Sequence, residues 1–148
     1  MRKKYPVAIA GLRVFKRLCL AIVLLLPVTT VANDCSKGCK AMSRGGHFQV
    51  IARPVPDKPL LSEYHDWTLE VRAANGTPVK LLGLSVSGGM AGHGHGLPSQ
   101  PRVAKYLGNG RYRLSGFLFN MHGEWTLRFH LAGRNLEDVA DLKLTLDY

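Results

Sequence analysis

The stretch Trp67-Thr-Leu-Glu-Val-Arg-Ala73 decides the fold of this chain. Its apolar residues occupy every second position, and Thr, Glu and Arg separate them. Successive side chains of an extended strand point to opposite faces, so a period of two predicts a strand with one buried face. The turn signal Asn75-Gly76 follows directly. We therefore expect a half-buried β-strand here.

The same alternation recurs along the chain and predicts an all-β protein. No long segment has helical periodicity. Two segments are expected to connect strands: Arg53–Pro59, since its prolines lack N–H donors, and Gly88–Pro101, which is rich in glycine and proline. Strands are expected at residues 48–52, 66–73, 79–87, 102–107, 112–118, 124–131 and 139–147. About seven short strands with turns between them predict an antiparallel β-sandwich of the immunoglobulin-like type.

The alternation also predicts which side chains share a face. It places Leu82, Leu84 and Val86 together on one strand, and Tyr112, Leu114, Gly116 and Leu118 together on another. Trp67 and Trp125 are expected to anchor the core between the two sheets.

The first 32 residues have the organisation of an export signal. Basic residues without any acid precede the apolar run Leu18–Leu26, and the small residues Thr30 and Ala32 follow it. The run is shorter than the about 20 residues of a transmembrane helix, so cleavage after Ala32 is favoured over an uncleaved anchor. The expected parts are a signal peptide or anchor at 1–32, a flexible Cys-containing leader at 33–46 and one β-sandwich domain at 47–148. We expect a periplasmic, exported protein or, alternatively, one anchored in the inner membrane with its domain facing the periplasm.

The positive charge of the chain belongs largely to this signal. The sequence has 20 Lys and Arg against 10 Asp and Glu, a net charge of +10. Six basic residues and no acid fall within residues 1–32, so the remainder has 14 against 10, or +4. No run of Lys and Arg remains that would outline a nucleic-acid surface, and nucleic acid is not expected as a partner.

Two cysteines follow the signal, in Cys35-Ser-Lys-Gly-Cys39. An exported compartment permits a disulfide between them, which is the interpretation that we favour slightly. Thiolates also bind cuprous copper, so Cys35 and Cys39 are secondary metal candidates. A thiol-redox role is a further alternative.

The stretch Met90-Ala-Gly-His93-Gly-His95-Gly96 indicates a function most directly. His93 and His95 are two positions apart, so on extended backbone they point to the same side, and the glycines let the chain bend around one ion. Imidazoles suit copper, zinc or nickel, whereas the thioether of Met90 favours copper, Cu(I) above Cu(II), with zinc less suited. The alternative is a surface loop whose histidines are merely solvated.

Met121-His122-Gly123 forms a second candidate group, just before the Trp125 strand. Loops at one end of a sandwich lie close together, so Met121 and His122 are further candidate metal ligands. Met121 could equally serve as packing, a common role of methionine. His65 and His130 lie at strand positions and are not expected to be primary ligands.

Catalytic motifs are missing from the sequence. It contains no Gly-x-Ser-x-Gly, no His-Glu-x-x-His and no phosphate-binding loop, and its acidic residues are scattered singly along strands. The sequence therefore favours binding or delivery of a metal over catalysis, and the protein is not expected to be an enzyme.

Residues 66–132 resemble the YtkA-like domain family and, more loosely, FixH-like proteins. The resemblance depends on the Met90–Gly96 loop together with Gly110–Met121 and Gly123-Glu-Trp125. It implies an exported or membrane-anchored β-sandwich linked to copper handling, with Met90, His93, His95 and Met121 as ligands, and it ranks Met121 above His122. The chain departs from the family pattern in the Cys-containing leader and in Ala91, where a proline is expected.

These observations favour an exported copper chaperone that buffers copper or delivers it to a partner. The resemblance suggests a copper-accepting envelope protein or an oxidase-assembly factor as that partner. The alternatives are a metal-independent interaction module of the cell envelope and a thiol-redox protein that uses Cys35 and Cys39. Membrane contact is expected only if the signal is uncleaved.

Overall fold

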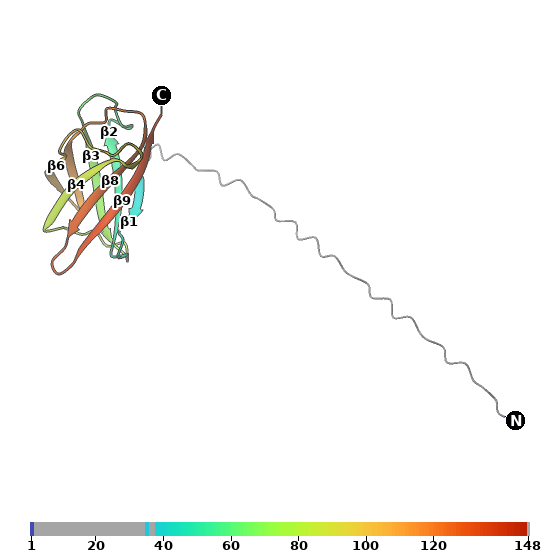
Figure 1. Cartoon of the computed structure of the whole chain (residues 1–148). Coiled ribbons are helices and arrows are strands. Elements are labelled where there is room, and N and C mark those ends of the chain that lie inside the picture. Colours follow the sequence, from blue (N-terminus) through green and yellow to red (C-terminus); the bar gives the residue numbers. More distant parts are fainter. Residues whose placement is uncertain (2–34, 36–37, 148) are drawn as a thin grey trace. The chain divides into compact units, whose positions relative to one another are not determined.

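The fold is described from a computed structural model of the chain (Figure 1). The structure describes residues 1, 35 and 38–147. The predicted signal peptide and its cleavage site fall in residues 2–34, outside the described residues. A single 3₁₀ turn is the helical element of the described part. None of the described helical segments has the length and apolar character needed to cross a membrane.

The strands form two antiparallel sheets. The five-stranded sheet has the order β1 (Cys39–Met42), β2 (Phe48–Val55), β3 (His65–Ala73), β7 (Arg111–Phe117) and β6 (Arg102–Gly108). The four-stranded sheet has the order β5 (His95–Gly96), β4 (Gly83–Met90), β8 (Gly123–Ala132) and β9 (Glu137–Leu146). When the short β1 and β5 are left out, the strand orders are β2-β3-β7-β6 and β4-β8-β9. These orders match the A-B-E-D and C-F-G sheets of an immunoglobulin constant-type domain. The predicted β-sandwich is therefore confirmed, with nine strands in the described residues instead of about seven.

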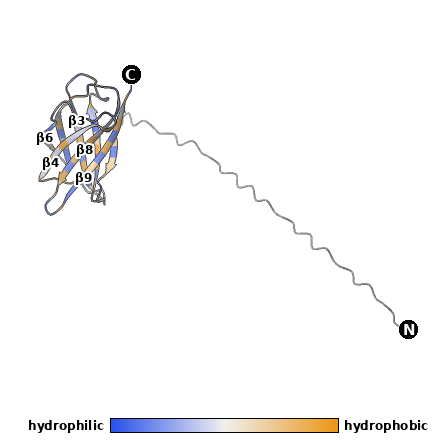
Figure 2. Ribbon diagram, in the orientation of Figure 1, coloured by the Kyte–Doolittle hydropathy of each residue, from blue (hydrophilic) through white to orange (hydrophobic). Residues whose placement is uncertain are grey.

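The core lies between the sheets and follows the predicted alternation. Trp67 of β3 and Trp125 of β8 are buried and come from opposite sheets. Figure 2 shows hydrophobic and hydrophilic positions alternating along the strands. Burying a large apolar side chain contributes about 1.5–3 kcal/mol, so these rows supply the main stabilisation. The inward rows of the three most regular strands are Trp67, Leu69 and Val71 of β3, Trp125, Leu127, Phe129 and Leu131 of β8, and Ala140, Leu142, Leu144 and Leu146 of β9.

Strand β2 runs through Pro54, in a segment that the sequence predicted to be a connection. Pro54 pairs with Trp67, and Val55 pairs with Asp66. Strand β1 covers the other side of β2 only as far as Ala52. At Pro54, β2 is therefore an edge strand, where a residue without an N–H donor is tolerated. The prediction was wrong because it treated the strand as central.

A β-bulge at Gly116 changes which residues at the end of β7 point into the core. Gly116 has a φ of 87°, and the pairing of β7 with β3 shifts between His65–Phe117 and Trp67–Leu114. One extra residue on a strand changes the face of every residue beyond it. Phe117 and Phe119 are therefore buried. The predicted inward position of Leu118 was wrong because a strict period of two has no place for a bulge.

Strand β4 begins later and ends later than predicted. Leu82 precedes it and is 75% exposed, whereas Leu84 and Val86 are half-buried. Gly88 and Gly89 pair with Leu127 and Thr126 of β8. Met90 is therefore the last residue of a sheet strand and not part of a loop, which corrects the predicted loop start at Gly88.

Residues 39–46 belong to the sandwich, which corrects the predicted leader at 33–46. Strand β1 pairs with β2 over its whole length. Beyond β1, Arg44 N donates to the Val139 carbonyl oxygen at 2.8 Å and Ser43 Oγ donates to Asp138 Oδ2 at 2.7 Å. These bonds join the edges of the two sheets. The sequence missed β1 because a four-residue strand is too short for alternation to define it.

Candidate metal centre

Antiparallel pairing brings both groups of candidate ligands to one end of the sandwich. Strand β4 ends at Met90 beside the beginning of β8 at Gly123. The end of β9 lies there too, since Leu146 pairs with Gly123, and the C-terminus marks this end in Figure 1. A Cβ added to Gly123 would lie 3.0 Å from Cε of Met90. The Met90 side chain thus ends beside Gly123, the last residue of the segment 120–123, which we call the methionine turn; residues 91–96 are the histidine loop.

The histidine loop reverses the chain within a few residues. Ala91–His93 form the 3₁₀ turn, and Gly94 has a φ of 67°, in the left-handed region that favours glycine. His95 then pairs with Met90 as β5 returns along β4. A side chain at Gly89 would clash with the carbonyl oxygen of His95. Gly89 is therefore needed because a side chain has no room there, and Gly94 is favoured by its backbone conformation.

His93 and His95 present exposed imidazoles that are neighbours. Their ring centroids are 6.4 Å apart, and their ring planes differ by 14°. Two imidazoles on opposite sides of one ion, with bonds of about 2 Å, have ring centres about 6 Å apart. The observed centroid separation is close to this value, although the two rings line different cavities.

The two loop histidines differ from His47, His65 and His130 in their hydrogen bonding. His47, His65 and His130 each make a hydrogen bond within the protein. Across residues 38–147, neither His93 nor His95 has one. Both ring nitrogens of each loop histidine are therefore available to a ligand or to solvent.

Met90 lies between the two cavities that the loop histidines line. One cavity contains His93 with Glu124 and Lys143, and the other contains His95 with Arg128. Met90 lines both of them although it is only 2% exposed. Its thioether is thus held by the core at the base of the histidine loop.

The methionine turn contributes unequally to this site. Met121 is half-buried against the core, and its carbonyl oxygen accepts a hydrogen bond from Trp125 Nε1 at 3.0 Å. His122 lines a different cavity, with Lys58, Leu61 and Asp147. That cavity shares no lining residue with the cavities of His93 and His95. The structure groups Met90 with His93 and His95, places Gly123 of the methionine turn beside Met90, and places His122 in a separate cavity.

The donor set decides which metal could fit. In the described part of the chain, no three or more His, Cys, Asp or Glu side chains gather as a metal-binding group. Glu124 is the carboxylate in the His93 cavity, and the cations Lys143 and Arg128 lie nearby. A site built on two imidazoles therefore needs thioether sulfur to complete it. That combination fits copper, whereas structural zinc prefers four Cys or His ligands.

Cys35 and Cys39 form a disulfide, the pairing that the sequence favoured slightly. Both residues are buried in the core. A disulfide sulfur is not a thiolate, which is the form that binds metal. Cys39 begins β1, in the five-stranded sheet, whereas the histidine loop belongs to the other sheet. Neither cysteine lines the cavities of His93 and His95.

His65 is a buried histidine at the same end of the sandwich as the loop. It is 6% exposed and packs among Trp67, Phe117 and Phe119, with the Phe119 ring centroid 5.6 Å away. Burial lowers the pKa of His65, so its neutral form is favoured. Its Nδ1–H donates to the Glu63 carbonyl oxygen at 3.1 Å. The aromatic surroundings make His65 part of the core.

Comparison of the chain with family models gives no match, and comparisons with curated proteins and with solved structures give no significant match. The resemblance to the YtkA-like family therefore stays a prediction, and the argument for a function comes from the geometry of the site.

Proposed function

We propose that this protein binds copper at the histidine loop, Cu(I) in preference to Cu(II). The ligands are the imidazoles of His93 and His95 and the thioether of Met90, with Met121 as the fourth candidate. One observation carries the proposal: His93 and His95, which make no hydrogen bond within residues 38–147, are ring neighbours, and both line cavities that the same methionine lines.

The softness of the donors supports copper over harder metals. Thioether sulfur selects Cu(I), and imidazole binds both copper ions. The core holds Met90, so one ligand is preorganised. The exposed histidines give the ion a route on and off the protein, which suits buffering or transfer.

Delivery to a partner is the role that we propose for the bound copper. The acceptor would be a copper-accepting envelope protein or an oxidase-assembly factor, and the protein would act in the periplasm after export. Membership of the YtkA-like family is part of the same proposal. Ser87 lines the His95 cavity, but its contact with His130 Nε2 is long, at 3.5 Å, and exposed, so we favour binding over catalysis for this site.

The decisive experiment is a copper titration against a competing chelator. The protein recovered from expression of the full chain is titrated with Cu(I) and, separately, with Cu(II). We expect one tightly bound Cu(I) per chain, and a loss of affinity of about a hundredfold or more in His93→Ala/His95→Ala, since two of the ligands are gone.

The matched control is His122→Ala/His130→Ala, which removes two imidazoles away from the histidine loop. We expect this variant to keep the wild-type affinity. The proposal fails if His93→Ala/His95→Ala binds Cu(I) as tightly as the wild type, or if the control loses as much affinity.

A further inference from the structure

The outer face of the five-stranded sheet gathers basic side chains from every strand of that sheet. Residues paired directly across neighbouring strands share a face, so the register assigns each side chain to the core or to the outside. Seven basic and two acidic side chains lie outside, a net charge of +5. The acids are Asp66 and Glu70. We call the seven cations the basic face: Lys40, Arg53, Arg72, Arg102, Lys105, Arg111 and Arg113.

The outer face of the four-stranded sheet has a different balance. Its outward strand positions carry two basic side chains, Arg128 and Lys143, against three acidic ones, Glu124, Glu137 and Asp141. The net charge there is −1. The sandwich is therefore electrically polarised between its two sheets, although residues 33–148 contain no run of Lys and Arg.

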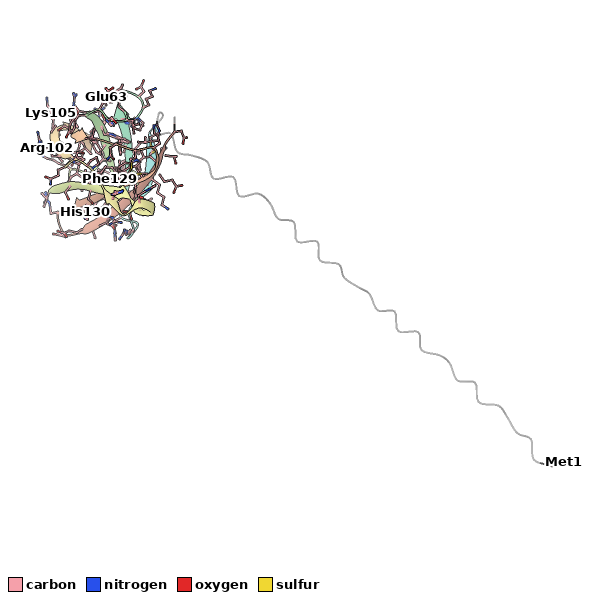
Figure 3. All side chains as sticks on the ribbon, turned by 45° about the horizontal axis from the view of Figure 1, so that its top comes forward. Met1, Glu63, Arg102, Lys105, Phe129 and His130 are labelled. Carbon is pink, nitrogen blue, oxygen red and sulfur yellow. A yellow bond between two sulfur atoms is a disulfide. The ribbon has the colours of Figure 1, made fainter. Side chains whose placement is uncertain are left out.

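The two acids on the basic face neutralise only part of it. Asp66 pairs with Arg113 at 2.7 Å, and Glu70 pairs with Arg72 and with Arg53. The remaining four cations, Lys40, Arg102, Lys105 and Arg111, are exposed and have no ion pair within residues 38–147. Figure 3 shows Arg102 and Lys105 at one side of the molecule, apart from His130 of the other sheet. Their charge is available to a partner.

The breadth of the face indicates what kind of partner fits it. Five strands about 4.8 Å apart spread the cations over a width of about 20 Å, so they do not converge on one small anion. Met42 and Val55 are 52% and 44% exposed and lie on the same face, since they pair with Gln49 and Asp66. A broad cationic face with exposed apolar side chains on β1 and β2 favours an anionic membrane surface, which offers both charge and an apolar interior.

We propose that the basic face docks onto an anionic phospholipid surface. The four-stranded sheet then faces away from the lipid, and with it the histidine loop, which stays open to solvent and to another protein. The inference is independent of copper, because none of the seven cations lines the cavities of His93 and His95.

Vesicle binding tests the inference directly. The protein recovered from expression of the full chain is mixed at low salt with phosphatidylcholine vesicles, or with vesicles that also contain phosphatidylglycerol. The ratio of the two affinities isolates the electrostatic part of binding from any apolar part. We expect a clear preference for the anionic vesicles that disappears near 1 M salt, where the screening length is about 3 Å.

The test variant is Lys105→Gln/Arg111→Gln, and the matched control is Lys58→Gln/Arg134→Gln, which removes the same charge outside the basic face. We expect the affinity of the test variant for anionic vesicles to fall by about tenfold or more. The control is expected to keep the wild-type preference. Circular dichroism and thermal unfolding verify that both variants are folded. Equal affinity for neutral and anionic vesicles, or an equal loss in the control, overturns the proposal. Retention on immobilised polyglutamate without vesicle binding also overturns it, and assigns the face to an acidic protein.

Discussion

The two ends of the sandwich use their polar side chains in opposite ways. Where β9 begins, the Asp138 carboxylate accepts hydrogen bonds from Ser43 Oγ at 2.7 Å, Gly45 N at 3.0 Å and His47 Nδ1 at 2.9 Å. At the other end, His93 and His95 make no hydrogen bond within residues 38–147. The polar groups around Asp138 are thus engaged within the protein, whereas the exposed imidazoles of the histidine loop are open to solvent or to a ligand.

The hydrogen bonds that Asp138 accepts from Ser43, Gly45 and His47 connect the two sheets, and we call this contact the latch. Burial by itself raises the pKa of the Asp138 carboxyl, but hydrogen bonds from Ser43, Gly45, His47 and Val139 outweigh it and hold the pKa far below its ordinary value. A Cβ on Gly45 would lie 2.8 Å from Oδ2 of Asp138, so the latch has no room for a side chain there. At this end the Asp138 carboxylate is engaged in structural hydrogen bonds, and it also lines a cavity with Arg44 and His130.

The largest effect is expected at Met90, which belongs both to the core and to the candidate metal site. Met90→Ala is expected to lower the free energy of unfolding by about 2–5 kcal/mol, because it leaves a cavity in the core. Met90→Leu conserves volume, so a loss below about 1.5 kcal/mol is expected. Chemical denaturation measures both values.

The same Met90→Leu variant separates the two roles of the residue. It removes the thioether, and we expect its Cu(I) affinity to fall about tenfold or more in the chelator titration. Wild-type Cu(I) affinity in a stable Met90→Leu protein would show that the sulfur is not a ligand and that Met90 only packs.

An intermediate effect is expected at the latch. Asp138→Asn is expected to cost about 1–3 kcal/mol at pH 7, because several donors lose a charged acceptor. The folded-state pKa of Asp138 lies below the unfolded value of about 3.9. Its stabilisation is therefore present above pH 4 and is lost as the pH falls towards the folded-state pKa.

Denaturation of the wild type and Asp138→Asn from pH 7 to pH 2 checks this prediction. The difference between them should be largest at neutral pH and should shrink in acid. Burial raises the pKa of Asp141, but Arg128 and Arg44 outweigh it and lower the pKa, so some acid sensitivity remains in the variant. A difference that grows in acid would contradict the latch.

The smallest effect on stability is expected for His93→Ala/His95→Ala. Both side chains are exposed and make no hydrogen bonds within residues 38–147, so the free energy of unfolding without metal should change by less than about 0.5 kcal/mol. Thermal and chemical unfolding without copper provide the measurement. A loss of several kcal/mol would mean that the histidines support the fold, and the contrast between the two ends would disappear.

Alternation in the sequence predicted the regular strands well. In β3, β8 and β9 the inward residues are those at every second position, because these strands have a polar and an apolar face. The prediction was wrong where a local feature interrupts the period, as at the Gly116 bulge and at Pro54 on the edge of β2. Such features depend on neighbouring strands, which a single stretch of sequence does not specify.

The candidate site could be predicted in part. The sequence singled out Met90, His93, His95, Met121 and His122, because thioethers and imidazoles are rare neighbours. It had no means of placing His122 in a separate cavity or Met90 in the sheet, since both depend on how β4, β8 and β9 pair. Neither did it show the latch, whose Ser43 and Asp138 are 95 residues apart.

By itself, the sequence determined that the chain forms half-buried strands and that the candidate metal ligands lie in two short stretches. Both follow from residue type and local spacing, which act over a few residues. The tertiary structure alone decided which ligands share an end of the sandwich, and it gathered seven cations from five strands on one face. Those arrangements arise from strand register, which joins residues distant in sequence at spacings of about 5 Å.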